Sequence, residues 1–219
     1  MTLRTRIKIC GLTREADVVA AALAGADAVG FVLYAKSPRY VNLERAAALA
    51  RALPPFVTPV CLFVNPSAAE VAAACAALPN ALLQFHGDET PADCDAARRP
   101  YLRAVRMAPG LDLLDCVLNF PHAQALLLDA AVDGYGGGGK VFDWSLIPPS
   151  LPADVRSRLV LSGGLSPANV VDGVVLARPF AVDVSSGVES AKGIKDAALM
   201  RRFCDAVREA DARLADLAT

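Results

Sequence analysis

Two side chains that can exchange protons stand at the ends of short apolar segments. Cys10 closes the segment 6–10, and Asp129 closes the apolar run 125–128. A carboxylate in apolar surroundings is costly to desolvate unless it is paired or used. A carboxylic acid and a thiolate can serve as general acid and general base. The pattern therefore indicates acid–base chemistry, against the structural alternatives of a buried thiol and a carboxylate that caps a helix or pairs with a cation.

The residues around Cys10 favour its thiolate form. Gly11 and a predicted helix start follow Cys10, and the N–H groups of a helix N-terminus stabilise negative charge. Lys8 alternates with Ile7 and Ile9, so it shares the strand face of Cys10 and adds positive charge there. A pairing of Lys8 with Asp183 is a further hypothesis, because the first and last strands of a closed barrel are neighbours.

Three more polar residues are candidates for substrate binding. Gln84 and His86 share one face of the segment 81–86, and His86 closes it. Arg39 lies in the run 36–41, where a guanidinium could bind a carboxylate in bidentate fashion. The alternative for Arg39 is a solvated arginine in a loop.

Two glycine- and serine-containing segments, 162–165 and 183–189, are typical of a phosphate site. Glycines let backbone N–H groups approach an anion, and serine hydroxyls add donors. In (βα)8 barrels, the loops after strands seven and eight often bind phosphate. The candidate residues in the two segments are Gly163, Gly164, Asp183, Ser185, Ser186 and Gly187.

Short apolar runs alternate with alanine-rich helical patterns along the whole chain, which indicates parallel strands joined by crossover helices. The predicted strands are 6–10, 28–32, 57–64, 81–86, 101–107, 124–129, 159–162 and 180–185. The predicted helices are 14–24, 43–53, 67–78, 90–98, 111–120, 144–147, 167–175 and 196–217. We therefore predict an α/β protein in which residues 1–219 form a single (βα)8 TIM barrel. A doubly wound sheet is the main alternative, but the early G-x-G-x-x-G turn typical of it is missing from the sequence.

Local signals place several helix starts. Ser67 and Glu70 have capping-box spacing, and Thr13 is a partial cap signal. Ser166 followed by Pro167 predicts a cap with proline at the first helical position. The glycine-rich segment 134–139 follows a predicted buried strand, where such loops are often mobile elements of an active site.

Composition narrows the class of protein. The formal net charge is −1, without the basic excess of a nucleic-acid binder. No apolar run is long enough to span a membrane, and the first residues lack the apolar core of a signal peptide. The six cysteines form no C-x-x-C pair, and with only two histidines no zinc spacing occurs. We expect a soluble cytoplasmic protein that binds neither nucleic acid nor membranes, with a monomer favoured over an oligomer.

The motifs together resemble those of the phosphoribosylanthranilate isomerases of tryptophan biosynthesis. The opening run 8–13, Lys-Ile-Cys-Gly-Leu-Thr, and the run 36–41, Lys-Ser-Pro-Arg-Tyr-Val, carry most of the resemblance. Matching segments follow in the same order at 84–87, 128–129, 136–144, 162–165 and 183–189, so the resemblance spans nearly the whole chain. The chain departs at Gly138, where the family pattern has serine or threonine, and at Ala35 and Phe85, which we interpret as loop and packing variation.

The resemblance implies a cofactor-free, metal-free (βα)8 barrel that acts on a small phosphosugar substrate by an Amadori rearrangement. It implies that Asp129 is the general acid that opens the sugar ring and that Cys10 is the general base at the sugar C2′. It further implies that Arg39 holds the anthranilate carboxylate, that Gly163, Gly164, Ser185 and Ser186 cradle the phosphate, and that Asp183 supports the site.

Other phosphosugar barrels fit the sequence less well. A metal-dependent epimerase would need histidines at several strand ends, and a Schiff-base aldolase would need a strand-end lysine where Asp129 stands. Indole-glycerol-phosphate synthase would need catalytic lysines on its early strands, and Cys10 occupies the strand end after Lys8. The histidine-pathway isomerase uses an aspartate at the position of Cys10, although a second activity of that type stays open. A non-catalytic phosphate-binding barrel is the alternative from another class, but it would not need Cys10 and Asp129 together.

Overall fold

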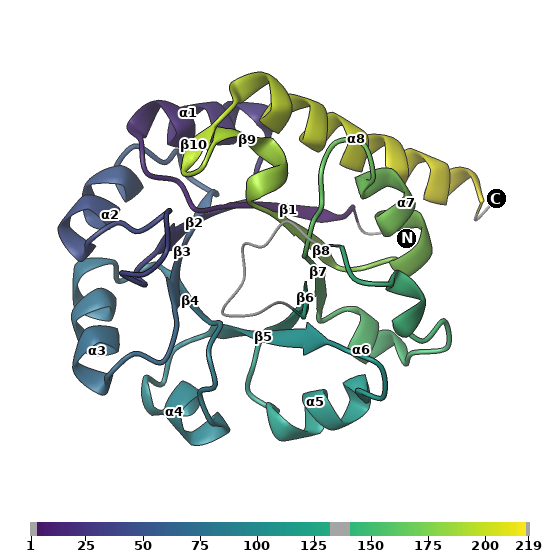
Figure 1. Ribbon diagram of the computed structural model, residues 1–219, viewed down its shortest axis with the longest axis horizontal. Coiled ribbons are helices and arrows are strands. Elements are labelled where there is room, and N and C mark those ends of the chain that lie inside the picture. Colours follow the sequence, from purple (N-terminus) through teal and green to yellow (C-terminus); the bar gives the residue numbers. More distant parts are fainter. Residues whose placement is uncertain (1–3, 132–140, 218–219) are drawn as a thin grey trace.

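Eight parallel strands form a closed barrel in sequence order, which confirms the predicted (βα)8 fold (Figure 1). The computed structural model describes residues 4–131 and 141–217. The barrel strands are β1 (Arg6–Cys10), β2 (Ala28–Val32), β3 (Thr58–Phe63), β4 (Leu82–Phe85), β5 (Tyr101–Met107), β6 (Ala125–Ala130), β7 (Leu159–Leu161) and β8 (Ala181–Val184). All eight predicted strands are therefore present: three have the predicted bounds, one is shifted by one residue, and four are one residue shorter at one or both ends.

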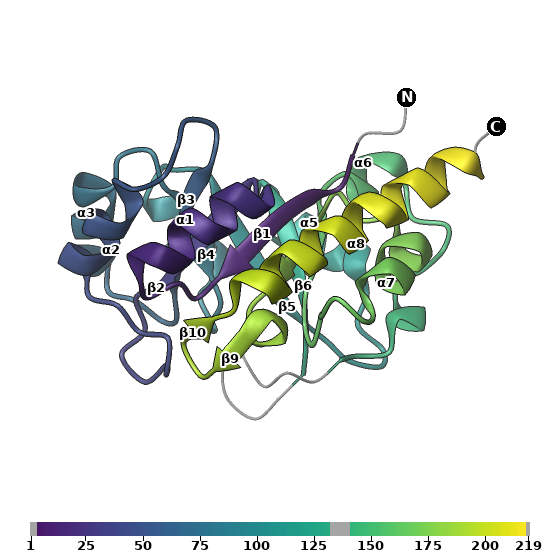
Figure 2. The same ribbon diagram turned by 90° about the horizontal axis from the view of Figure 1, so that it is seen from above.

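The helices surround the barrel and bury its outer face, as the view down the barrel shows (Figure 1). They are α1 (Glu15–Ala24), α2 (Leu43–Ala50), α3 (Ala68–Ala77), α4 (Pro91–Ala96), α5 (Leu113–Asn119), α6 (Ala153–Arg156), α7 (Val170–Ala177) and α8 (Ala197–Asp216). The long α8 packs beside both α1 and α7, so it closes the helical ring between the last unit and the first (Figures 1 and 2).

Two of the predicted helix caps need correction. The capping box at Ser67 is confirmed, since its hydroxyl accepts from the Glu70 N–H and the Glu70 carboxylate accepts from the Ser67 N–H. The predicted cap at Ser166 is wrong, because residues 166–169 form a turn and α7 begins only after Asn169. Thr13 is not a cap either, since its hydroxyl donates to the Gly193 carbonyl oxygen.

The sixth βα unit also differs from the prediction. The predicted helix 144–147 is a single 3₁₀ turn, η1 (Trp144–Leu146), and the true helix α6 comes later. Pro148, Pro149 and Pro152 separate the two, and proline cannot supply the N–H that would continue a helix. The predicted glycine loop 134–139, including Gly138, lies outside the described residues.

A short hairpin that was not predicted connects β8 to α8. After the 3₁₀ turn η2 (Ser186–Val188), strands β9 (Glu189–Ala191) and β10 (Ile194–Lys195) pair antiparallel. The turn between them uses Gly193 at a φ of 78°, a backbone conformation that favours glycine. Strands of two or three residues carry too little periodicity to be found in a sequence.

The barrel interior has an apolar layer and a polar layer. Residues from five strands fill the apolar layer, among them Leu102, Leu127, Val160 and Ala181. Towards the carboxyl ends of the strands, the interior residues are polar and still buried: Lys8, Gln84, Asp129, Ser162 and Asp183. Ile7 and Ile9 instead belong to the large core between strands and helices. The predicted inward direction of Lys8 and Cys10 is therefore confirmed.

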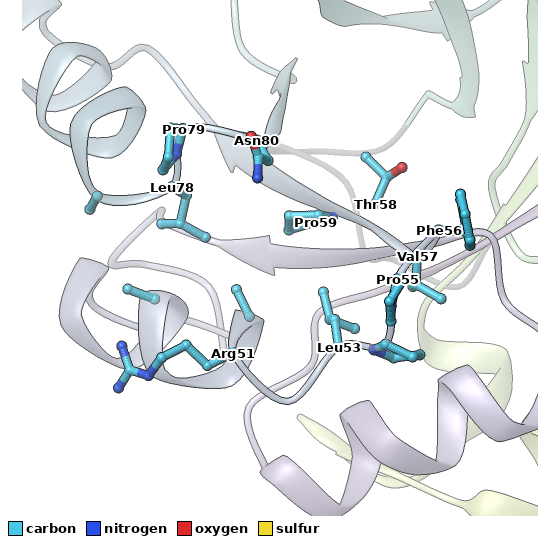
Figure 3. Close-up of a pocket in the computed structure, with 14 residues that line it drawn as sticks. Arg51, Leu53, Pro55, Phe56, Val57, Thr58, Pro59, Leu78, Pro79 and Asn80 are labelled. Carbon is cyan, nitrogen blue, oxygen red and sulfur yellow. The ribbon is translucent and has the colours of Figure 1, made fainter.

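A groove of about 680 Å³ lies at the other end of the barrel, between α2, α3 and the amino end of β3 (Figure 3). Its lining is largely apolar and includes Leu53, Pro55, Val57, Pro59 and Leu78. Thr58 begins β3, so this groove opens at the amino ends of the strands. The polar interior residues lie at the carboxyl ends, which is the catalytic face of such barrels. The groove is therefore separate from the candidate active site.

Candidate active site

Cys10 and Asp129 both lie at the carboxyl end of the barrel. Cys10 is the last residue of β1 and Asp129 is the second-last residue of β6, and they are 4% and 8% exposed. Strands β7 and β8 separate β6 from β1 on the shorter path around the barrel. The thiol and the carboxylate therefore reach the barrel mouth from well-separated strands, as an acid and a base on two sides of a small substrate would.

The space for the Cys10 sulfur depends on Gly30 of the neighbouring strand. Gly30 is the register partner of Cys10 between β1 and β2. A Cβ atom added to Gly30 would lie 2.6 Å from the Cys10 Sγ, which is closer than van der Waals contact allows. The glycine therefore leaves room for the thiol against the sheet.

Burial raises the pKa of the Cys10 thiol, and the nearby Lys8 ammonium acts in the opposite direction. The sequence predicted that the N-terminus of a helix stabilises the Cys10 thiolate. No helix begins directly after Cys10, because residues 11–14 intervene and α1 begins only at Glu15. The predicted favourable effect of Lys8 on the thiolate is present, but it is smaller than the effect of burial. In the free protein, the thiol form is therefore favoured more than the sequence suggested.

Lys8 forms a buried ion pair with Asp183. Its Nζ lies 2.7 Å from Asp183 Oδ1, and the two side chains are 5% and 7% exposed. The two residues are register partners between β1 and β8, which confirms the pairing inferred from strand neighbourhood. Ser162 contacts the second carboxylate oxygen at 3.5 Å, from the end of β7.

Asp129 is the end of a hydrogen-bonded chain across β4 and β6. His86 Nε2 lies 3.0 Å from Asp129 Oδ2, and Gln84 Nε2 lies 3.1 Å from His86 Nδ1. An amide nitrogen can only donate, so with this amide orientation His86 Nδ1 accepts and Nε2 donates to the carboxylate. Asp129 Oδ1 accepts from the Ala130 N–H at 2.9 Å. Gln84 is fully buried below His86, so these two residues orient Asp129 as one unit.

A second buried ion pair holds the backbone on both sides of His86. Arg103 Nη1 lies 2.6 Å from Glu89 Oε2, and the guanidinium also donates to the carbonyl oxygens of Phe85 and Gly87. The Glu89 carboxylate accepts from the N–H groups of Gly87 and Asn65. The loops after β3 and β4 are thereby connected beside the candidate site.

The two predicted phosphate segments lie against each other. Gly163 and Gly164 have φ values of 77° and 65°, in the left-handed region. A Cβ at Gly163 would meet the Ala130 backbone nitrogen at 2.7 Å, and one at Gly187 would lie 1.9 Å from the Leu165 carbonyl oxygen. Close backbone approach therefore requires glycine at both positions, and at Gly187 it places the second segment against Leu165 of the first.

Arg39 is not the solvated loop residue that the alternative described. Its side chain is 8% exposed, and Nε and Nη2 lie 2.7 and 2.9 Å from the Glu189 carboxylate. Lys195 also binds Glu189, at 2.8 Å, and donates to the carbonyl and hydroxyl oxygens of Ser185. Burial acts to raise the pKa of Glu189, but the hydrogen bonds from Arg39 and Lys195 lower it overall.

The sequence did not reveal the role of several residues that build this site. Glu189 lay inside a recognised motif without a stated role, and Lys195 lies in the hairpin that was not predicted. Gly30, Glu89 and Arg103 gave no signal, because their roles depend on neighbours from other strands. Within the described ranges, no group of three or more His, Cys, Asp or Glu side chains is placed to hold a metal ion. No helix in these ranges is long and apolar enough to cross a membrane.

Comparison with known proteins places the chain in one family. A family model described as "N-(5'phosphoribosyl)anthranilate (PRA) isomerase" matches residues 7–206. A relative from Methylibium petroleiphilum with the name N-(5'-phosphoribosyl)anthranilate isomerase is 73% identical over 213 residues, which cover 97% of this chain and 98% of the relative.

Solved structures agree with this result. The phosphoribosylanthranilate isomerase of Thermotoga maritima superposes with a TM-score of 0.83 at 40% identity, covering 94% of this chain and 99% of that one. An isomerase crystallised with reduced 1-(o-carboxyphenylamino)-1-deoxyribulose 5-phosphate superposes with a TM-score of 0.79 at 38% identity, with the same coverage. The chain therefore belongs to the N-(5'-phosphoribosyl)anthranilate isomerase family and is an isomerase.

Proposed function

We propose that this protein converts N-(5-phosphoribosyl)anthranilate into 1-(2-carboxyphenylamino)-1-deoxyribulose 5-phosphate, with Asp129 as general acid and Cys10 as general base. The observation that carries these roles is the placement of a buried carboxylate and a buried thiol on separate strands of one barrel mouth. The substrate is supported by relatives named for this isomerase and by a similar structure that holds a reduced form of the product.

In the first step, Asp129 gives its proton to the furanose ring oxygen, and the C1′–O bond breaks to leave a protonated Schiff base. His86 and Gln84 orient the carboxyl group for this transfer through the chain described above. Positioned proton transfers of this kind typically contribute a factor of roughly 10²–10⁴ in rate.

In the second step, the Cys10 thiolate removes the proton from the sugar C2′. The electron pair of that C–H bond forms a C1′–C2′ double bond, which neutralises the Schiff base and gives an enolamine. Tautomerisation of the enolamine moves the C2′ hydroxyl proton to C1′ and produces the ketone. Substrate and product are isomers, so the sequence of steps needs no oxidant or reductant. Proton exchange with solvent then returns Cys10 to the thiolate and Asp129 to the carboxylic acid.

Both ends of the substrate carry charge, and the proposed binding groups match them. The backbone N–H groups and hydroxyls of Gly163, Gly164, Ser185, Ser186 and Gly187 are proposed to hold the phosphate. Arg39 is proposed to hold the anthranilate carboxylate, although its guanidinium group already binds Glu189 in the free protein. Fixing the substrate at two ends can supply several kcal/mol of the barrier reduction.

All of the residues assigned to binding and catalysis come from loops and strands of one barrel. We therefore propose that the chain works as one catalytic domain spanning residues 1–219.

The test follows the loss of anthranilate-type fluorescence after the substrate is generated in situ, without added metal or cofactor. Asp129→Asn and Cys10→Ser are each expected to lower kcat by a factor of about 10² or more, because each removes one proton transfer. The matched controls are Asp205→Asn on the exposed face of α8 and Cys75→Ser in α3, both of which should keep wild-type rates.

Circular dichroism establishes that each variant is folded. A near-wild-type rate in either test variant would contradict the role of that residue. An inactive, folded wild-type protein would contradict the substrate and direct attention to the histidine-pathway substrate or to a non-catalytic role.

A further inference from the structure

The ion pair of Lys8 and Asp183 is buried at a position where stability alone does not explain it. Desolvating two charges offsets most of the attraction between them, so apolar residues of similar size would serve the fold equally well. Lys8 occupies the interior position directly before Cys10 on the same face of β1. Asp183 lies beside Lys8 in register on β8.

The charges of Lys8, Asp183, Lys195 and Arg39 act on the Cys10 side chain. Two of them are occupied elsewhere, since Lys195 binds Ser185 and Glu189, and Arg39 binds Glu189. The Lys8 ammonium carries three N–H donors and donates to Asp183, and its charge acts on Cys10, two residues further along the same face of β1. On the β2 side, the register partner of Cys10 is Gly30, which has no side chain.

We propose that Lys8, held in place by Asp183, is the positioning residue that stabilises the Cys10 thiolate and so sets the pH at which Cys10 acts as a base. This inference rests on the proposed function, in which Cys10 removes a proton from the substrate. Asp183 supplies the opposing charge, so the pair as a whole is neutral while Cys10 is a thiol.

The two members of the pair act on Cys10 with opposite signs. The positive charge of Lys8 lowers the pKa of Cys10, and the negative charge of Asp183 raises it, with Lys8 having the larger effect. Removing each charge alone must therefore shift the ionisation of Cys10 in opposite directions. Loss of packing or general loosening of the barrel would move both variants in the same direction.

The experiment is a difference titration of thiolate ultraviolet absorbance. The wild type, Lys8→Met, Asp183→Asn and the double variant Lys8→Met/Asp183→Asn are each compared with the same protein carrying Cys10→Ser. The subtraction removes the signals of the other five of the six cysteines and of the tyrosines. Arg213→Met, which removes an exposed cation at the end of α8, is the control for a general charge effect.

The expected order of Cys10 ionisation midpoints, from low to high pH, is Asp183→Asn, wild type, double variant and Lys8→Met. A charge within 4–6 Å shifts a pKa by about 1–3 units. The midpoints of Asp183→Asn and Lys8→Met should therefore each differ from that of the wild type by at least about one pH unit. Arg213→Met should titrate like the wild type. The ascending limb of kcat/KM against pH should move in the same order, because it reports the base of the free enzyme.

Equal midpoints in all four proteins would overturn the proposal, as would a downward shift in Lys8→Met. If Lys8→Met does not fold, the double variant decides the question, because it replaces the pair with two neutral side chains. A midpoint of the double variant at or below that of the wild type would then overturn the proposal. The titration needs no turnover, so it separates this proposal from the base role, which Cys10→Ser tests by activity.

Discussion

The position of the Cys10 thiol depends on the missing side chain of Gly30, its neighbour on β2. Gly30 keeps an ordinary backbone conformation, so its role is purely the space beside Sγ. Any side chain at this position would displace the sulfur from its place at the barrel mouth, where the substrate is proposed to bind. The geometry of the proposed base is therefore set partly by residue 30, which carries no functional group.

Gly30→Ala is expected to reduce kcat and to lower the free energy of unfolding by about 1–3 kcal/mol, because the added methyl overpacks the sulfur. Urea unfolding and the fluorescence assay measure the two effects. The control is the same substitution in a Cys10→Ala background, where the sulfur is gone and most of the destabilisation should disappear. Equal destabilisation in both backgrounds would show that Gly30 does not make room for Cys10.

At the scale of elements, the loops after β3 and β4 are joined by the Arg103–Glu89 pair. The guanidinium extends from the outer face of β5 and contacts the backbone on each side of His86. It also lies over the Phe120 ring, 4.9 Å from the centroid, next to α5. One ion pair therefore connects three consecutive βα units beside the residue that orients Asp129.

Arg103→Met should lower the free energy of unfolding by about 3–5 kcal/mol, because it leaves the Glu89 carboxylate buried without its cation. Urea denaturation measures this change. The control is Asp205→Asn, which breaks the pair with Arg208 on the exposed surface of α8 and should change the free energy by less than about 1 kcal/mol. Similar values for the two variants would mean that the buried pair does not carry this share of the stability.

At the scale of the whole molecule, buried thiols make the fold sensitive to alkaline pH. Burial raises the pKa of Cys61 from 9.0 to about 12 and that of Cys204 from 9.0 to about 11. Above pH 9 the unfolded chain releases these protons, whereas the folded protein retains them until the higher pKa is reached. Their contribution to stability is therefore complete below pH 9 and is lost as the pH rises towards 11–12.

Cys204→Ala tests this linkage, since it removes one of these two thiols, the one on the buried face of α8. The free energy of unfolding of the wild type should fall more steeply above about pH 9 than that of Cys204→Ala, by up to about 1 kcal/mol per pH unit. Urea unfolding at several pH values between about 7 and 10.5 measures both slopes. Parallel slopes would contradict a raised pKa for the Cys204 thiol.

The strand pattern and its consequences were accessible from the sequence. Alternation of Ile7 and Ile9 with Lys8 and Cys10 is a local property of one strand. It already predicts that Lys8 and Cys10 face the barrel interior. A closed barrel then makes the first and last strands neighbours, so the Lys8–Asp183 pair could be inferred from the sequence. The proposed acid and the proposed base were identified in the same way, as polar ends of apolar strands.

Short and irregular elements could not be predicted. The hairpin β9–β10 and the four-residue helix α6 are too short to show a period, and their position depends on the turns and prolines around them. Helix α7 begins later than predicted, because the turn at 166–169 already provides hydrogen bonds for the polar groups that the expected cap would have used.

The sequence by itself determined the class of fold, the polar character of the barrel mouth and the identity of the two groups that could exchange protons, because these follow from local periodicity. Only the tertiary structure decided which charges meet. Arg39 and Glu189 pair across 150 residues, and no short-range pattern encodes such a contact. The same is true of Gly30, whose importance lies in the approach of β1 to β2. Contacts of this kind depend on the register of strands and the packing of loops, which exist only once the barrel has closed.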